Sequence, residues 1–391
     1  MKKSLIALAL MGAFSGAAIA QSNVTLYGIL DVNVQRNDPK EGNATTTTGV
    51  NGGHQSGNRW GVRGSEALGG GMSAIFTLES GFNIDDGTTA QSNSTIPVTS
   101  PVTPPTQRLF GRQAWAGIQF DNAKMAVVAG RIASFSSGTG SFDFFGQVDP
   151  FLTGFGDSSL GSTFTSAGAL RLDNTIAVVG GPWAGFRGGA AYSFNVAGAE
   201  AAGSSNNNTA IALGAAWSGG PFMVGVTYDI VDVAQSGVAL GGTNPVVPAG
   251  APDQKHLQIG GTWDLKFVKL HAAYAKEDNV YFTSGVGINL DAGADADAWM
   301  LGVTVPLFGG QFLASYQDRD GDPIQVRIGS TTAPLVTRER DLSVWAIGYT
   351  YPLSRRTNAY INWSSRDGEK SANGNSTIDR NQGTIGIRHL F

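Results

Sequence analysis

The chain ends in Gly386-Ile387-Arg388-His389-Leu390-Phe391, and no residue follows the final aromatic. Two parities alternate: Ile385, Ile387, His389 and Phe391 share one, and Thr384, Gly386, Arg388 and Leu390 share the other. Chain ends of soluble proteins usually fray, so an alternating strand that continues to the last residue indicates a pairing that holds it. The last strand of a closed membrane barrel has such a pairing, because the barrel leaves no edge open. This end of the chain therefore favours a transmembrane β-barrel.

The first twenty residues have the features of a secretory signal. Lys2 and Lys3 supply a positive start, residues 5–14 form a short apolar run, and Ala18-Ile19-Ala20 resembles a cleavage site. The apolar run is too short for a membrane-spanning helix. We expect export with removal of residues 1–20, which leaves residues 21–391 as one barrel domain without an internal linker.

Composition excludes several classes of function. Of the 26 basic and 30 acidic residues, two lysines belong to the expected signal, so the mature chain has 24 basic residues and a net charge of −6. That charge gives no footprint for nucleic acid. The chain has no cysteine, and its four histidines show no i, i+4 pair. We expect neither a metal nor a cofactor.

Apolar and polar residues alternate along most of the chain. Clear examples are residues 222–229, 256–263 and 299–305. Period two with one apolar and one polar face is the pattern of a β-strand. Outside the expected signal no segment approaches 18 consecutive apolar residues, which excludes helical spans. The fold class predicted is all-β.

The connectors between these strands distinguish a barrel from a sandwich. Seven short turns alternate with eight long loops, which predicts sixteen antiparallel strands. Tight turns on the periplasmic rim and long loops on the cell surface are typical of outer-membrane barrels. The expected long loops are Asn37–Ser56, Ile84–Thr106, Ile132–Ala169, Asn195–Asn207, Val233–Gln254, Asp278–Ala294, Asp320–Arg338 and Asp367–Thr377.

The third long loop differs from the others, with about 38 residues and seven phenylalanines. So much apolar surface is poorly suited to a loop in water, and long loops with apolar content are usually packed and functional. We expect it to fold into the barrel and narrow it, with Asp143, Asp149 and Asp157 as acidic pore residues. The alternative is an outward loop packed on a partner subunit.

Arginines on the polar face are the expected counterparts of these acids. Arg59 and Arg63 lie opposite Trp60 and Val62 in the alternation. Arg131 and Arg171 flank the third loop. Arginines that face carboxylates across a narrow aqueous gap determine ion preference. For Arg388, near the closing end, a structural role is expected instead.

Eight stretches together resemble the Gram-negative general diffusion porins, in the trimeric sixteen-strand group. They are Val24–Asp31, Asn58–Gly71, Phe76–Glu79, Arg112–Gly117, Ala129–Arg131, Arg171–Asn174, Tyr351–Thr357 and Gly386–Phe391. The resemblance implies a homotrimer, an inward third loop, basic wall residues at Arg59 and Arg171, and an acidic one at Glu79. It also implies that the outer-membrane assembly machinery reads Phe391. The family often has a basic residue where this chain has Gly111, so the constriction is expected to be less basic or wider.

The predicted function is a water-filled outer-membrane channel for passive diffusion of small hydrophilic solutes and ions, embedded among outer-membrane lipid and lipopolysaccharide. Local charge near the constriction should outweigh distant loop charge, because charges beyond about 10 Å are screened. A weak anion preference follows. The alternatives are a barrel hydrolase, for which His256 or His271 is the candidate base without a serine beside it, and an adhesin or receptor barrel that only displays loops.

Overall fold

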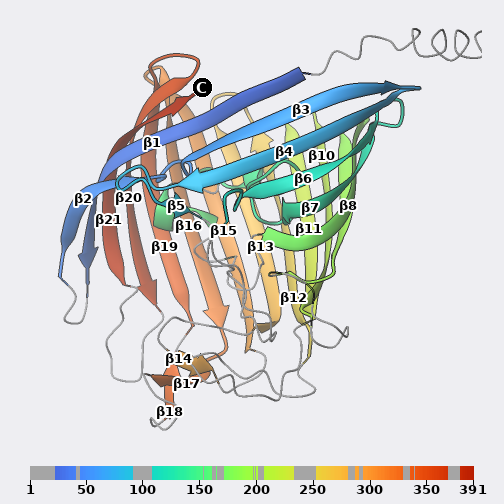
Figure 1. Cartoon of the computed structure of the whole chain (residues 1–391). Coiled ribbons are helices and arrows are strands. Elements are labelled where there is room, and N and C mark those ends of the chain that lie inside the picture. The colour runs from blue at the N-terminus through green and yellow to red at the C-terminus, as the bar shows by residue number, and fades with distance from the viewer. Residues whose placement is uncertain are drawn as a thin grey trace, which may run out of the picture.

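The computed structural model is a closed, antiparallel β-barrel (Figure 1). It describes residues 23–40, 45–90, 108–152, 154–160, 164, 171–196, 198, 200, 207–232, 252–280, 287–289, 294–328, 335–338, 340–368 and 379–391. The barrel strands are β1 Asn23–Pro39, β3 Arg59–Gly69, β4 Met72–Phe82, β6 Gln113–Phe120, β7 Met125–Ala133, β8 Arg171–Trp183, β9 Phe186–Ser193, β10 Thr209–Gly219, β11 Phe222–Asp232, β12 Gln254–Asp264, β13 Lys269–Val280, β15 Ala294–Leu307, β16 Gly310–Gly321, β19 Leu342–Pro352, β20 Thr357–Gly368 and β21 Arg380–Leu390.

These sixteen strands confirm the predicted count. Two further segments join the same sheet without adding a position to it. β2 (Thr47–Gly52) pairs with the second half of β1, on the side where β3 pairs with the first half. β5 (Thr89–Ala90) pairs with the end of β4, beside which β6 also lies. Among the described residues, no helix is long and apolar enough to cross a membrane.

The barrel closes through its first and last strands, β1 and β21. β21 pairs with β1 from Ile29↔Leu390 to Pro39↔Arg380. Beyond this ladder, the backbone N–H groups of Gly28 and Phe391 each donate to the other residue's carbonyl oxygen at 3.1 Å. Each terminal strand therefore satisfies the edge that the other would expose, as the alternating C-terminal stretch predicted.

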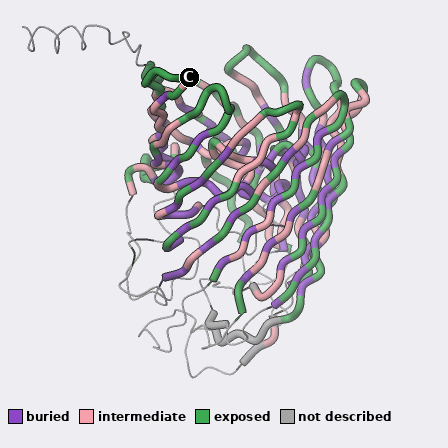
Figure 2. The backbone as a smooth tube through the Cα atoms, turned by 90° about the vertical axis from the view of Figure 1, so that its right-hand side faces the viewer, coloured by how far each residue is buried: buried purple, intermediate pink, exposed green. Residues whose placement is uncertain are grey.

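The two faces of the wall have the polarity of a membrane barrel. Along β11, Phe222, Val224 and Val226 are exposed on the outside, whereas Met223 and Thr227 are buried on the inside. Exposed and buried residues alternate in this way around the barrel (Figure 2). An apolar exterior around a polar interior suits hydrocarbon outside and water inside.

Four of the expected long loops contain short strands, including Ile84–Thr106, in which β5 lies. Within the expected loop Asn37–Ser56, Thr47–Gly52 is strand β2, because the chain continues to pair with the long β1 before Gly53 turns it at φ 75°. The expected loops Asp278–Ala294 and Asp320–Arg338 contain β14 (Gly287–Asn289), β17 (Ile324–Ile328) and β18 (Leu335–Arg338). These form a separate small sheet, because neighbouring loops on one rim can pair their backbones. Residues 91–106 of Ile84–Thr106, residues 233–251 of Val233–Gln254 and residues 369–377 of Asp367–Thr377 lie outside the described residues.

The third loop follows β7 and lies inside the barrel, as predicted. It contains two short 3₁₀ turns, η1 (Gly146–Val148) and η2 (Gly156–Ser158). Six of its seven phenylalanines are buried, with Phe135 and Phe144 under β10 and Phe151 under β19, and Phe142 is partly buried. Gly154 crosses the wall so closely that a Cβ there would lie 1.9 Å from the carbonyl oxygen of Gln55. Burial of apolar rings inside the barrel thus holds a loop that water would not.

Candidate pore constriction

The inward third loop and the wall at the start of β3 enclose a cavity of about 490 Å³. On the wall side it is lined by residues 53–57, Arg59 and Arg112; on the loop side it is lined by residues 138–140, Asp143 and residues 152–159 in part. Gly53 makes this geometry possible, because the wall strand leaves the sheet between β2 and β3 and meets the loop. There the backbone N–H of Phe155 donates to the carbonyl oxygen of His54.

Glu79 is the acidic residue of the wall at the constriction, and its carboxylate is bound by two neighbouring side chains. Arg112 Nε lies 2.6 Å from Glu79 Oε1, and the hydroxyl of Tyr27 donates to Glu79 Oε2 at 2.9 Å. Tyr27 and Glu79 lie on either side of Gly61 in the strand register. A Cβ on Gly61 would lie 2.7 Å from the Tyr27 ring, so glycine there lets the phenol reach across β3.

Arg59 and Arg171 lie beside this group with few partners of their own. Arg59 Nε donates to the carbonyl oxygen of Gly57 at 2.9 Å. The Nε of Arg171 is buried without a hydrogen-bond partner. Both guanidinium groups lie within electrostatic reach of Arg112 and Glu79. Among the described residues neither forms an ion pair. Arg59 lines the cavity, and Arg171 lies behind that lining.

A second group of charges lies next to Arg171. Arg131 and Arg108 both bind Asp173, the latter through Nη2 to Oδ2 at 2.6 Å. Arg131 Nε also donates to the carbonyl oxygen of Gly111, at 2.8 Å. Gly111, at the position where the family often has a basic residue, thus contributes a backbone hydrogen-bond acceptor instead of a charge.

Arg63 lies two residues beyond Gly61 along β3, toward the short turn that leads to β4. Its guanidinium stands over the ring of Tyr27, 5.1 Å from the centroid. The side chain is exposed, and this stacking is a cation–π contact. Of the predicted pore arginines, Arg59, Arg131 and Arg171 are brought together, and Arg63 lies at the margin.

Two of the three predicted loop acids are bound by their own loop. Asp143 accepts hydrogen bonds from the backbone N–H groups of Phe145 and Gly146, at 3.0 and 2.8 Å. Burial raises the pKa of Asp143 above its ordinary 3.8, although these amides oppose the shift. Asp149 is fully buried and accepts from the N–H groups of Phe151 and Leu160 at 2.8 and 2.9 Å.

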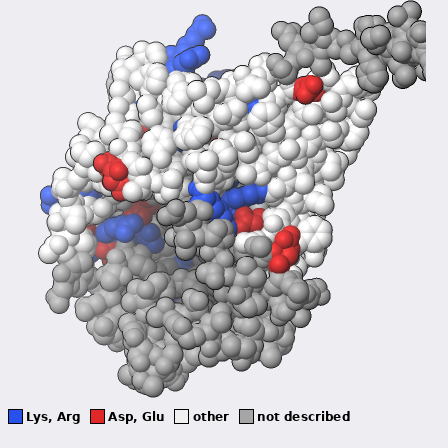
Figure 3. Space-filling model, viewed as in Figure 1, with Lys and Arg blue, Asp and Glu red and all other residues white. Residues whose placement is uncertain are grey.

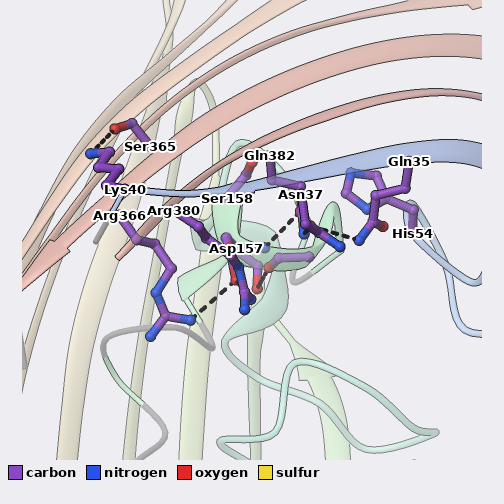
Figure 4. A network of polar contacts seen from close by, with 12 residues as sticks. Gln35, Asn37, Lys40, His54, Asp157, Ser158, Ser365, Arg366, Arg380 and Gln382 are labelled. Atoms are coloured by element: carbon purple, nitrogen blue, oxygen red, sulfur yellow. Dashed lines mark hydrogen bonds and ion pairs between the residues drawn. The ribbon is translucent and has the colours of Figure 1, made fainter. Parts of the chain in front are cut away.

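Charged side chains gather around the hollow of the barrel, while the surrounding wall is mostly uncharged (Figure 3). Asp157, the last of the three predicted loop acids, anchors the loop to the barrel wall at β20 and β21 (Figure 4). Arg380 binds it through two nitrogens at 2.6 Å each, and Arg366 binds it at 3.1 Å. Burial raises the pKa of this carboxyl, but Arg380 and Arg366 outweigh burial and hold the pKa below 3.8. Asp157 therefore stays ionised and neutralised between two arginines.

Sequence reasoning missed Arg108, Arg112 and Asp173 as members of this site. Arg112 and Asp173 stood in quoted stretches, but neither parity nor spacing showed that Arg112 reaches Glu79 across 33 positions. The side chains show their partners only once the strands are closed into a barrel.

The candidate bases of a barrel hydrolase lie among other partners. His256 lies 3.6 Å from Glu277, and Ser136 donates to Asp229 rather than to His256. His271 contacts the carbonyl oxygen of Val148 and the hydroxyl of Thr304. Neither histidine is joined to a serine in a nucleophile–base pair by these contacts.

A closed barrel with an apolar exterior, a polar lumen and a loop that narrows it defines a membrane channel protein. The family model for Gram-negative porins matches residues 6–371. An outer membrane porin protein of Bordetella pertussis is 31% identical, over all of both chains. Outer membrane porin protein 32 of Delftia acidovorans is 28% identical, over 93% of this chain and 88% of its own. This chain belongs to the Gram-negative porin family, and it is located in the outer membrane.

Solved structures agree on the fold. An anion-selective porin from Comamonas acidovorans superposes with a TM-score of 0.67 at 20% identity, over 95% of this chain and all of its own. The trimer form of OmpT of Vibrio cholerae has a TM-score of 0.59 at 14% identity, over 95% of this chain and 99% of its own. The barrel provides an aqueous path through the membrane, which is the basis of diffusion in this family.

Proposed function

We propose that this porin is a passive channel with a preference for anions, and that Arg59, Arg112 and Arg171 set that preference. The observation that carries the proposal is the charge balance at the constriction. Arg59 and Arg112 line the cavity, and Arg108, Arg131 and Arg171 lie beside it. These five guanidinium groups stand against the carboxylates of Glu79 and Asp173, which leaves +3. Even full ionisation of Asp143 leaves +2.

The fate of the loop acids supports a stronger preference than the sequence suggested. Three aspartates on the loop were expected to offset the arginines, but Asp157 is matched by two cations and Asp149 is fully buried against backbone amides. A positive field in a narrow aqueous gap favours anions and disfavours cations. That a structural relative is described as anion-selective agrees with this reading.

We also propose the assembly inferred from sequence: export by residues 1–20, recognition of Phe391 by the assembly machinery, and a homotrimer surrounded by outer-membrane lipid and lipopolysaccharide. The trimer form of a structural relative supports the oligomer. On an unheated gel the extracted protein should migrate as an oligomer that dissociates on boiling. A monomer under gentle extraction would refute the trimer.

Reversal potentials in planar bilayers test the channel and its selectivity together. The inserted protein should conduct in discrete single-channel steps. In a tenfold potassium chloride gradient, its reversal potential should have the sign of anion preference. A potential of opposite sign would refute anion preference. Absence of conductance would favour the adhesin or receptor barrel or the hydrolase. A screen of ester and peptide substrates would then distinguish these two alternatives.

A further inference from the structure

A second cavity lies in the barrel on the periplasmic side of the third loop. It holds about 470 Å³ between the loop tip, at Pro150, Leu152 and Phe155, and the wall formed by β15, β16 and β19–β21. Arg355, Arg356 and Arg388 line it, and the described residues that line it include no Asp or Glu. We call it the periplasmic chamber. It shares Gln55 and Leu152 with the cavity at the constriction, so the two cavities are neighbours along the pore.

Arg388 is oriented between the two cavities. Its Nε donates to Asn358 Oδ1 at 3.0 Å, and its Nη1 donates to Ser56 Oγ at 2.9 Å. Ser56 lines the constriction cavity, and Arg388 is within electrostatic reach of Arg59. These bonds agree with the structural role expected from sequence, but they also fix a cation at the entrance of the chamber.

The carboxylate whose charge acts most directly on Arg388, that of Asp31, is hydrogen-bonded to other residues. Asp31 is fully buried, and it accepts a hydrogen bond from Tyr360 at 2.5 Å and another from the backbone N–H of Ser56 at 2.7 Å. Its field acts on Arg388, but no ion pair within 4.0 Å joins the two in the described part of the chain. Arg388 therefore keeps donor capacity toward the chamber.

The turn between β19 and β20 brings two more cations to a defined place. Ser354 Oγ accepts from the backbone N–H groups of Arg356 and Thr357, at 3.2 and 3.1 Å. The carbonyl oxygen of Arg356 accepts from the N–H of Leu390 at 2.8 Å, which ties the turn to the closing strand. Both arginine side chains are exposed and form no ion pair among the described residues. The constriction uses nothing from this stretch, although the sequence singled it out.

We propose that the periplasmic chamber is a second subsite for small oxyanions such as inorganic phosphate or a carboxylate. An anion that leaves Arg59 and Arg112 would next meet Arg388, Arg356 and Arg355 rather than bare water. Guanidinium groups suit this ligand class, because their paired N–H donors match carboxylate and phosphate oxygens. The inference rests on the proposed anion passage and adds a place where the anion pauses.

The test is block of chloride current by inorganic phosphate, measured on the full-length trimer in neutral phosphatidylcholine bilayers at 0.1 M potassium chloride. The variant carries Arg355→Gln with Arg356→Gln, on an exposed turn where loss of charge should not disturb folding. The matched control carries Lys124→Gln with Lys266→Gln, two exposed lysines on the same rim that do not line the chamber. Phosphate should half-block the arginine variant at about fivefold higher concentration than wild type, from two screened charges at short range. The lysine variant should match wild type.

Equal half-block in the arginine and lysine variants would overturn the subsite, as would absence of phosphate block in wild type. Phosphatidylglycerol in the bilayer distinguishes a lipid phosphate from a free one: if it abolishes the block, the arginines face lipid and the chamber site is refuted. Failure of the anion preference itself would appear separately, as a cation-selective reversal potential in wild type. The arginine turn variant should keep the wild-type sign of that potential, because Arg59, Arg112 and Arg171 remain.

Discussion

Replacement of Arg59 and Arg171 by glutamine should reduce anion preference by about an order of magnitude. An ion about 6 Å from one guanidinium interacts with it by about 0.7 kcal/mol in water, and by about 0.4 kcal/mol after screening at 0.1 M salt. Two arginines change the free energy of chloride in the pore by about 0.8 kcal/mol, and that of potassium equally with opposite sign. The sum corresponds to about a tenfold change in the anion-to-cation permeability ratio.

The assay is the reversal potential of single channels in a potassium chloride gradient. Neither arginine forms an ion pair in the described part of the chain, so the variant should still insert as a folded oligomer. The control carries Asp320→Asn with Asp322→Asn, two exposed acids at the opposite rim. The same number of charges changes there, at residues that do not line the constriction cavity, so screening should weaken their effect. If the aspartate pair moves the potential as much as the arginine pair, the constriction lies elsewhere.

Three further perturbations test the loop and the closure. Asp157→Asn leaves Arg366 and Arg380 without their anion, which should cost about 2–4 kcal/mol and increase open-channel noise. Because the folded pKa of Asp157 is lowered, the stability that its ion pairs contribute is present above pH about 4 and is lost as pH falls through the folded pKa. Open-channel noise that changes neither with the substitution nor with pH would contradict this anchor. Gly154→Ala places a Cβ 1.9 Å from the carbonyl oxygen of Gln55, so the loop tip should shift and single-channel conductance should change. Deletion of Phe391 removes two hydrogen bonds to Gly28 and should lower the amount of inserted oligomer on gels; Gly28→Ala, whose Cβ would lie 2.3 Å from the Phe391 ring, should share that defect, and full insertion of both would refute the closing role.

The sequence by itself determined the barrel. Alternation is a local property of a strand, and in a membrane each backbone group must be paired, so sixteen alternating segments permit few architectures. The third loop was also readable, because phenylalanines such as Phe135 and Phe151 need a dry environment and the lumen-facing wall provides one. Among the described loops, those that pair among themselves or with a barrel strand, such as the loops that contain β2, β14 and β17, were not predicted.

Tertiary structure alone decided how the charges are used. Asp143, Asp149 and Asp157 look alike in sequence, yet backbone amides bind the first two and arginines 209 and 223 positions away bind the third. Arg112 reaches Glu79 from another strand, and Arg388 meets the periplasmic chamber through the closure of the barrel. The direction of a side chain in an irregular loop follows no period, and its partners come from distant strands. The charge that an ion meets in the pore is therefore a property of the folded barrel.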